Sequence, residues 1–201
     1  MKRMFLLFFC SVFLMLLGCS QIKTANVDPT KEYQENDAFL LVRVHAHKTG
    51  NLGIWKGDLN KIAQLEQSKE DQLRLVPVKV IKGATITNYY YDEYAANFEG
   101  LSFNIEPGAI NYVGDVHIGL VEGELKSFSQ AVIDGWNMAS SQRVDTQKNN
   151  VYAGIVIKDN EQDTVKAAAE LFPGLLEKYP VINQVPKKQQ ATARMVFVGR
   201  I

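Results

Sequence analysis

The chain has 201 residues, of which 46% are hydrophobic, and it carries 22 basic and 22 acidic side chains. This balance argues against a nucleic-acid partner and against a polybasic membrane patch, because both need an excess of lysine and arginine. The length and hydrophobic content suffice for one domain that buries roughly 70% of its unfolded surface. We therefore expect a single globular domain with an ordinary hydrophobic core.

The first eighteen residues have the three parts of a secretion signal. Lys2 and Arg3 supply a basic start, Met4 to Leu17 form an apolar run, and Gly18 is the small residue before a cleavage site. The apolar run is shorter than the roughly 20 residues that a membrane-spanning helix needs. We predict a signal peptide over residues 1–18, and an uncleaved membrane helix is the alternative.

The signal ends in Leu16-Leu17-Gly18-Cys19, which resembles the lipobox of bacterial lipoproteins. The resemblance implies cleavage before Cys19, a diacylglycerol on its thiol and an acyl group on its new amino terminus. Two or more acyl chains anchor a protein stably, whereas one binds a membrane reversibly. Ser20 stands where an aspartate would favour retention in the inner membrane. The resemblance therefore implies the periplasmic face of the outer membrane, with the inner membrane or a Gram-positive cell surface as alternatives.

The two cysteines restrict the chemistry of the mature domain. Cys10 lies within the signal and Cys19 is assigned to the lipid, which leaves neither a disulfide nor a free thiol. A cysteine nucleophile is thereby excluded. The sequence also lacks a Gly-x-Ser-x-Gly elbow, a His-Glu-x-x-His motif and a Gly-x-x-x-x-Gly-Lys phosphate loop. We expect no cofactor, and we favour a non-enzymatic role over catalysis.

The mature chain divides into a linker and one domain. Residues 19–36 are polar and show no sustained apolar period, so we predict a lipidated flexible tether; about sixteen residues of coil span roughly 20 to 25 Å. Residues 37–201 are predicted to form the domain. Its first strand covers 37–47, where apolar and polar residues alternate from Val42 onward.

The next elements are predicted from turn residues and caps. Residues 48–57 are rich in glycine and predict a turn, while Asp58 is placed to cap a short helix that ends at Gln67. A strand follows over 73–81, and Pro77 restricts it to a sheet edge or a bulge because proline donates no ladder hydrogen bond.

The segment from Leu101 to Val116 has the sharpest local pattern. Apolar residues alternate with polar ones on both sides of a Pro107-Gly108 turn: Leu101, Phe103 and Ile105 before it, Ile110 and Tyr112 after it. We predict that the two strands pair as a hairpin. The hairpin is similar to those of small bacterial envelope lipoproteins without an assigned function, and the resemblance supports a β-sandwich.

The last part of the chain predicts three more strands and a helix. Strands are expected over 128–133, 151–158 and 193–198, with a long loop over 134–150. Asp159 or Asn160 caps a helix over about 160–179 that Pro173-Gly174 interrupts. The fold class is therefore predicted as mainly β, a β-sandwich of about seven strands with a C-terminal helix.

Histidines and aspartate suggest one site. His45 and His47 are two residues apart on a predicted strand, so both side chains share a face, and Asp115 and His117 repeat this spacing on another. If those two strands pair, the side chains can gather around zinc or copper and serve metal binding or hydrolysis. The alternative is that they are ordinary surface residues at two strand ends, and this alternative we favour.

Four tyrosines within Tyr89 to Tyr94 suggest a second site. Tyrosine offers apolar area and a polar tip, so these rings can form a surface for a glycan or a protein, or alternate rings can belong to the core. The lipobox resemblance leads us to expect a membrane-anchored envelope lipoprotein with a non-enzymatic binding role. Its expected partners are the membrane, through the lipid, and another envelope component, most plausibly a protein.

Overall fold

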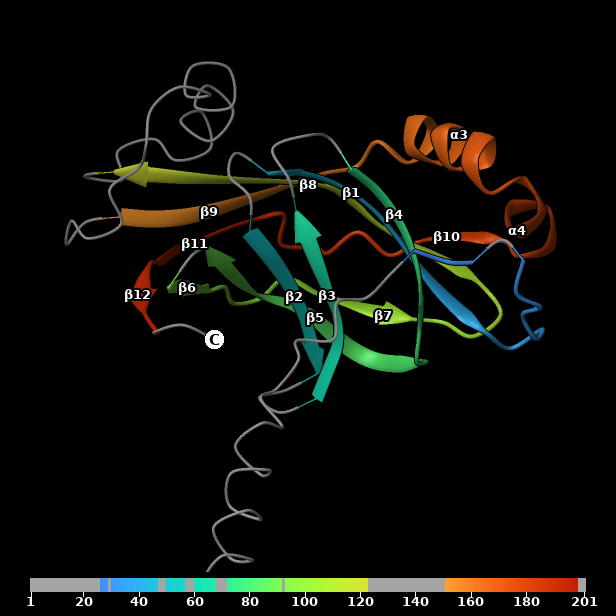
Figure 1. Cartoon of the computed structure of the whole chain (residues 1–201), viewed down its shortest axis with the longest axis horizontal. Coiled ribbons are helices and arrows are strands. Elements are labelled where there is room, and N and C mark those ends of the chain that lie inside the picture. Colours follow the sequence, from blue (N-terminus) through green and yellow to red (C-terminus); the bar gives the residue numbers. More distant parts are fainter. Residues whose placement is uncertain are drawn as a thin grey trace, which may run out of the picture.

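The computed structural model of the chain describes residues 26–28, 30–46, 50–56, 60–67, 72–91, 93–122 and 151–198. Within these residues, twelve strands form two six-stranded sheets, and two helices lie near the C-terminal end (Figure 1). The predicted fold class, mainly β with a C-terminal helix, is confirmed, and the strands outnumber the seven or so expected. The signal, the lipobox and the elements predicted over 128–150 lie outside the described residues.

Sheet A has the strand order β11-β9-β8-β1-β4, and β10 also pairs with β8. Its strands are β1 (Ala38–Ala46), β4 (Gln72–Val78), β8 (Ile110–Glu122), β9 (Val151–Lys158), β10 (Val181–Asn183) and β11 (Gln190–Arg194). β8 runs parallel to β1 and to β10, and the other pairs of this sheet are antiparallel.

Sheet B has the order β12-β6-β5-β2-β3, with β7 beside β5, and all its described pairs are antiparallel. Its strands are β2 (Gly50–Lys56), β3 (Asn60–Gln67), β5 (Ile81–Tyr91), β6 (Tyr94–Asn97), β7 (Ser102–Ile105) and β12 (Val196–Phe197).

The main core lies between the two sheets. Alternate residues of β1 point toward sheet B because side chains of a strand alternate between its faces. Leu40 and Val42 thus join Leu52, Ile54 and Ile86 of sheet B in one apolar cluster, and all five are fully buried. This face-to-face packing makes the fold a two-sheet sandwich.

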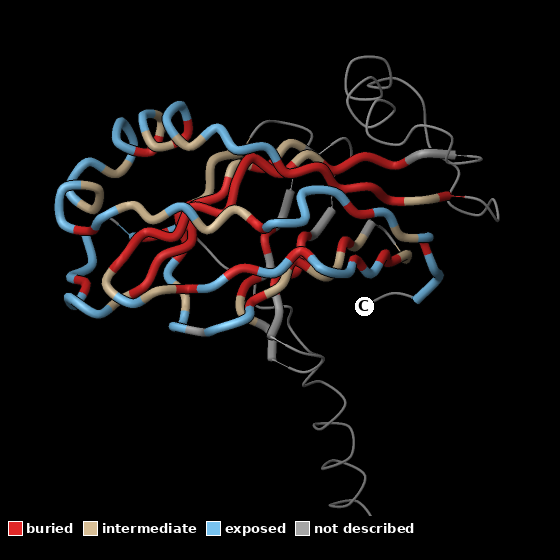
Figure 2. The backbone as a smooth tube through the Cα atoms, turned by 180° about the vertical axis from the view of Figure 1, so that it is seen from behind, coloured by how far each residue is buried: buried red, intermediate tan, exposed pale blue. Residues whose placement is uncertain are grey.

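A second core covers the outer face of sheet A. This face presents Phe39, Leu41 and Ile110. Helix α3 (Glu161–Leu171) packs Ala168 against it, and helix α4 (Pro173–Lys178) adds the partly buried Leu175 and Leu176. Figure 2 shows buried strands beneath helices whose outer turns are exposed. At this end the molecule therefore has three layers: helices, sheet A and sheet B. None of the described helices is long and apolar enough to cross a membrane.

The N-terminal segment corrects the predicted tether. The backbone N–H of Val27 donates to the carbonyl of Leu75 at 2.7 Å, and the Asn26 side-chain oxygen accepts from the Leu75 N–H at 3.2 Å. Val27 and Tyr33 are buried in the second core. The prediction of a flexible tether over 19–36 is thus wrong from Asn26 onward, because two isolated apolar residues anchor the segment without producing a periodic pattern.

Two early elements also differ from prediction. Residues predicted as a glycine-rich turn form β2, and those predicted as a helix form β3, which pairs with β2 as a hairpin. Ala63 and Leu65 are both buried, which is the period of a strand. Pairing with neighbouring strands therefore overrides the local helix signal, as tertiary context often does.

The Pro107-Gly108 turn does not close a hairpin. β7 pairs with β5 in sheet B, whereas β8 lies in the middle of sheet A, so the turn carries the chain from one sheet to the other. Gly108 has φ +62°, and a Cβ there would lie 2.8 Å from the Glu35 carbonyl oxygen. The predicted alternation holds, since Leu101 and Ile110 are buried, but the predicted pairing is wrong.

Other predictions are confirmed. β4 contains Pro77 and is the last strand of sheet A, the edge position that the proline requires. β9 occupies the predicted 151–158, and the helix expected after it is interrupted at Pro173, where α4 begins. The predicted terminal strand is found as β11 followed by β12.

Candidate functional site

A bulge in β8 creates the most polar buried site of the described chain. Leu41 of β1 pairs with Tyr112, but Arg43 pairs with Asp115, so β8 contains one extra residue at this point. Gly114 there has φ +105°, and a Cβ would overlap a methyl group of Ile157. The extra residue shifts the alternation of β8 by one. Tyr112 and Asp115 therefore share the face that α3 covers.

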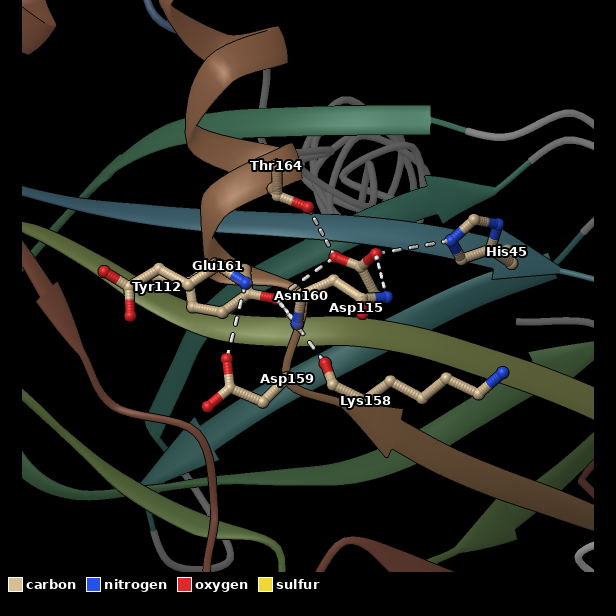
Figure 3. Close-up of polar contacts among 8 residues, drawn as sticks. All are labelled: His45, Tyr112, Asp115, Lys158, Asp159, Asn160, Glu161 and Thr164. Carbon is tan, nitrogen blue, oxygen red and sulfur yellow. Dashed lines mark hydrogen bonds and ion pairs between the residues drawn. The ribbon is translucent and has the colours of Figure 1, made fainter.

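The Asp115 carboxylate is held by groups from three elements (Figure 3). Its Oδ1 accepts hydrogen bonds from the Thr164 hydroxyl at 2.7 Å and from the Tyr112 hydroxyl at 3.2 Å. Its Oδ2 accepts from the Asn160 amide at 3.1 Å and lies 3.9 Å from Nε2 of His45. Asp115 is 3% exposed. A buried carboxylate needs such partners, so this network fastens the start of α3 to sheet A.

Asn160 and Tyr112 complete the junction. Asn160 precedes α3, but its side chain binds Asp115 and makes no capping hydrogen bond to the helix. Its backbone N–H donates to the Tyr112 hydroxyl at 2.9 Å, and that hydroxyl also lies 3.4 Å from the Lys158 carbonyl oxygen. Burial raises the pKa of Tyr112 above its ordinary value. The phenol therefore stays protonated and keeps donating to Asp115.

His45 and His117 lie beside this network in neighbouring strands. The two residues are register partners of parallel strands, and their rings stack with centroids 4.2 Å apart and an interplanar angle of 2°. Burial lowers the pKa of His117 to about 4, and the nearby His45 and Lys158 act in the same direction. His117 is thus neutral at neutral pH.

The carboxyl group of Asp115 has a lowered pKa. Burial alone raises its pKa, but the contacts with His45, Thr164 and Asn160 outweigh burial and hold the pKa below the usual value. Asp115 is therefore a carboxylate at neutral pH. Its negative charge lies inside the fold, where it faces the start of α3 and His45.

The structure brings together three of the four residues of the metal hypothesis. β1 and β8 are neighbours, as that hypothesis required, so His45, Asp115 and His117 converge; His47 lies outside the described residues. Both Asp115 oxygens are engaged by internal donors. Among the residues that the structure describes, no group of three or more histidine, cysteine, aspartate or glutamate side chains is arranged to hold a metal ion.

The tyrosine segment is divided between core and surface. Tyr89 is 1% exposed and packs between the sheets, whereas the Tyr90 hydroxyl accepts from the Asn88 amide at 3.2 Å on the half-buried side of β5. Tyr94 is half-buried and contacts Phe197 edge to face, with centroids 5.5 Å apart. Of the tyrosines whose side chains the structure describes, Tyr89 belongs to the core, and the partly exposed Tyr94 continues onto β12.

The β12 patch consists of Tyr94, Val196, Phe197 and Val198. The last three are consecutive apolar residues and are 58%, 61% and 45% exposed. β12 ends the strand order of sheet B in the described part of the chain. The sequence of residues 193–198 predicts a strand but not its position at an edge, because strand order depends on long-range pairing.

Comparison of this chain with protein families, with curated proteins and with solved structures finds no match.

Proposed function

We propose that this protein is a lipid-anchored bacterial envelope protein whose sandwich domain binds a protein partner through the β12 patch. The anchor is supported by the lipobox-like Leu16-Leu17-Gly18-Cys19, with Cys19 as the lipidated residue. The proposed location is the periplasmic face of the outer membrane, because Ser20 stands where an aspartate would favour retention in the inner membrane. The role is binding and not catalysis.

The observation that carries the binding role is the exposure of three consecutive apolar side chains on a terminal strand. Sheet edges are normally protected by charges, prolines or covering segments, because an open edge invites pairing with another chain. β12 is only two residues long, but within the described part of the chain neither a charged residue nor a proline interrupts the exposed Val196 to Val198. Aromatic residues are enriched at protein interfaces, which fits Tyr94 and Phe197 as the contact pair.

Partner binding is tested by crosslinking in living cells followed by mass spectrometry. We expect a reproducible partner with the native protein and its loss in Phe197→Asp. Val80→Asp is the matched control, since Val80 is 48% exposed in the β4–β5 connection, outside the β12 patch. Equal crosslinking in both variants would contradict the assignment of the patch.

The anchor is tested separately by the mass of the mature N-terminus. We expect a chain that begins at an acylated Cys19, and a Cys19→Ala form that is not acylated. An unmodified cysteine, or a chain that retains residues 1–18, would overturn the anchor without affecting the test of the patch.

The second candidate function is metal binding or hydrolysis through His45, His47, Asp115 and His117. It is favoured because His45, Asp115 and His117 lie close together. Neutral imidazole is the form that binds zinc or copper. Addition of zinc would then raise the melting temperature of the native protein and leave that of His117→Gln unchanged. Equal responses of the two proteins would end this candidate.

A further inference from the structure

The end of the domain that carries α4 has a hollow whose lining mixes basic and apolar side chains. A hollow of about 450 Å³ opens there between the N-terminal segment and the α3–α4 elbow. Its lining combines lysines with apolar and aromatic side chains, among them Lys31, Tyr33, Leu171, Phe172, Leu175 and Lys178. We call these six residues the elbow face.

The elbow face exposes apolar area beside two ammonium groups. Leu171 is 60% exposed at the end of α3. The ammonium group of Lys31 lies 5.2 Å from the centre of the Tyr33 ring, and that of Lys178 donates to the Tyr33 carbonyl oxygen. Lysines extend their apolar stems along such surfaces while their charge reaches phosphate groups. Glu32 is the one acidic residue among the described residues that line the hollow.

The position of the chain brings this face close to the anchor. Asn26 and Val27 are hydrogen-bonded to Leu75 of β4. Cys19 lies only seven positions before Asn26 in the chain. Fully extended, this stretch reaches about 25 Å, and as a coil it averages roughly 15 Å. If Cys19 is lipidated, the surface around Asn26 must stay near the bilayer.

The elbow face adjoins Asn26. Val27 belongs to the same apolar cluster as Phe172 and Leu175, and the N–H of Asp28 donates to the Tyr33 hydroxyl at 3.1 Å. In Figure 1, α4 and β12 lie at opposite ends of the long axis. A bilayer at the elbow face would therefore leave the β12 patch at the end of the domain away from the membrane.

From these observations we propose that the elbow face contacts the surface of a bilayer that contains anionic phospholipid. Leu171 enters the interface, and Lys31 and Lys178 lie at the phosphate level. This inference rests on the proposed lipid anchor, because the short link to Cys19 selects the face. It assigns the domain one orientation on the membrane, which the anchor alone does not do.

The test uses the native lipidated protein with one fluorescent probe at a time. Cys19 is blocked by its lipid, so a new cysteine takes the label alone. Leu171→Cys is compared with Val80→Cys and Val196→Cys, whose positions are 48% and 58% exposed. Each labelled protein is incorporated into vesicles of phosphatidylcholine and phosphatidylglycerol that contain lipid-attached quenchers at the depth of the interface.

We expect quenching of the probe at residue 171 to be several times that at residues 80 and 196. Replacing Lys31 and Lys178 by glutamine, or omitting phosphatidylglycerol, lowers quenching at 171 alone. Equal quenching at the three positions, or none at 171, overturns the proposal. Flotation with the vesicles, measured on the same samples, reports the anchor: a protein that does not float refutes lipidation, whereas a floating protein without quenching at 171 refutes the orientation.

Discussion

One edge strand of each sheet differs in how far other residues cover it: β4 in sheet A and β12 in sheet B. At β4, the last strand of sheet A, Asn26 and Val27 bind the backbone of Leu75 and cover the edge. At β12, the last strand of sheet B, consecutive apolar residues are exposed. Among the described residues, the N-terminal segment therefore binds the edge strand of sheet A, whereas the apolar side chains of β12 are exposed. An edge that is exposed and apolar is a position where another chain can bind.

The covered end depends most on Asp115, which fastens α3 over sheet A. Asp115→Ala should lower the free energy of unfolding by about 3 kcal/mol, because it leaves the buried donors of Thr164, Tyr112 and Asn160 without their acceptor. Urea denaturation measures this loss. Asp163→Ala, on the exposed side of α3, is the control and should change stability by less than about 0.5 kcal/mol. A similar small effect at Asp115 would show that the network does not hold the helix.

Acid should weaken the same end through His117. Its folded pKa of about 4 lies below the ordinary 6.5, so between these values the unfolded chain binds a proton that the native one does not. Stability should therefore fall as the pH drops from about 6.5 to 4, by roughly 3 kcal/mol in total. The lowered pKa of Asp115 removes stability only below about 3.8.

Urea denaturation across this pH range, with the native protein beside His117→Gln, checks the assignment. The variant should lose much of the slope between pH 6.5 and 4. An unchanged slope would place the titrating group elsewhere.

Uncovering the β4 edge should have a smaller effect. Val27→Ala removes two buried methyl groups and should lower the free energy of unfolding by roughly 1 to 2 kcal/mol. Because the segment also shields the edge, hydrogen exchange at Leu75 should become faster. The exposed Thr30→Ala serves as control, and equal exchange at Leu75 in both variants would indicate that the segment does not protect the strand.

The β12 patch should contribute least to stability. Val196→Asp should change the free energy of unfolding by less than about 0.5 kcal/mol, since the side chain is already 58% exposed. Thermal and urea unfolding measure this. A loss of several kcal/mol would mean that the patch is a structural part of the sandwich, and the contrast between the two edges would disappear.

The sequence predicted the elements whose pattern is local. β1, β4 and β9 have alternating or continuous apolar residues, and Pro77 marks an edge strand because proline lacks an N–H. The helix near the C-terminus follows from its apolar stripe and from Pro173. In each case residues close together in the chain carry enough information.

The errors arise where distant residues decide. β2 and β3 are strands because they pair with β5 and with each other, which their glycines and caps do not reveal. The Pro107-Gly108 turn joins two sheets, although its alternation is equally suited to a hairpin. Contacts made by a single apolar residue, such as Val27 with sheet A, also cannot be predicted from hydrophobic periodicity, because one buried residue forms no repeating pattern.

The candidate sites show the same limit. Spacing placed His45 with one strand and Asp115 with another, but only the parallel pairing of β1 and β8 makes them neighbours. Thr164 and Asn160 were not predicted as partners of Asp115, because they reach it from a helix more than forty residues away in the chain. An unusual glycine at 114, within an apolar strand, was the one local signal of the bulge that joins them.

The most direct test of this account is site-specific photocrosslinking in living cells from two of the exposed valine positions, 196 and 80. A photoreactive residue at position 196 should yield a reproducible adduct with a partner protein, and the same residue at position 80 should not. The adduct from 196 should also disappear when Phe197 is replaced by aspartate. Adducts from position 80 alone, or from neither position, would contradict the proposal that the β12 edge is the surface this protein uses to bind its partner.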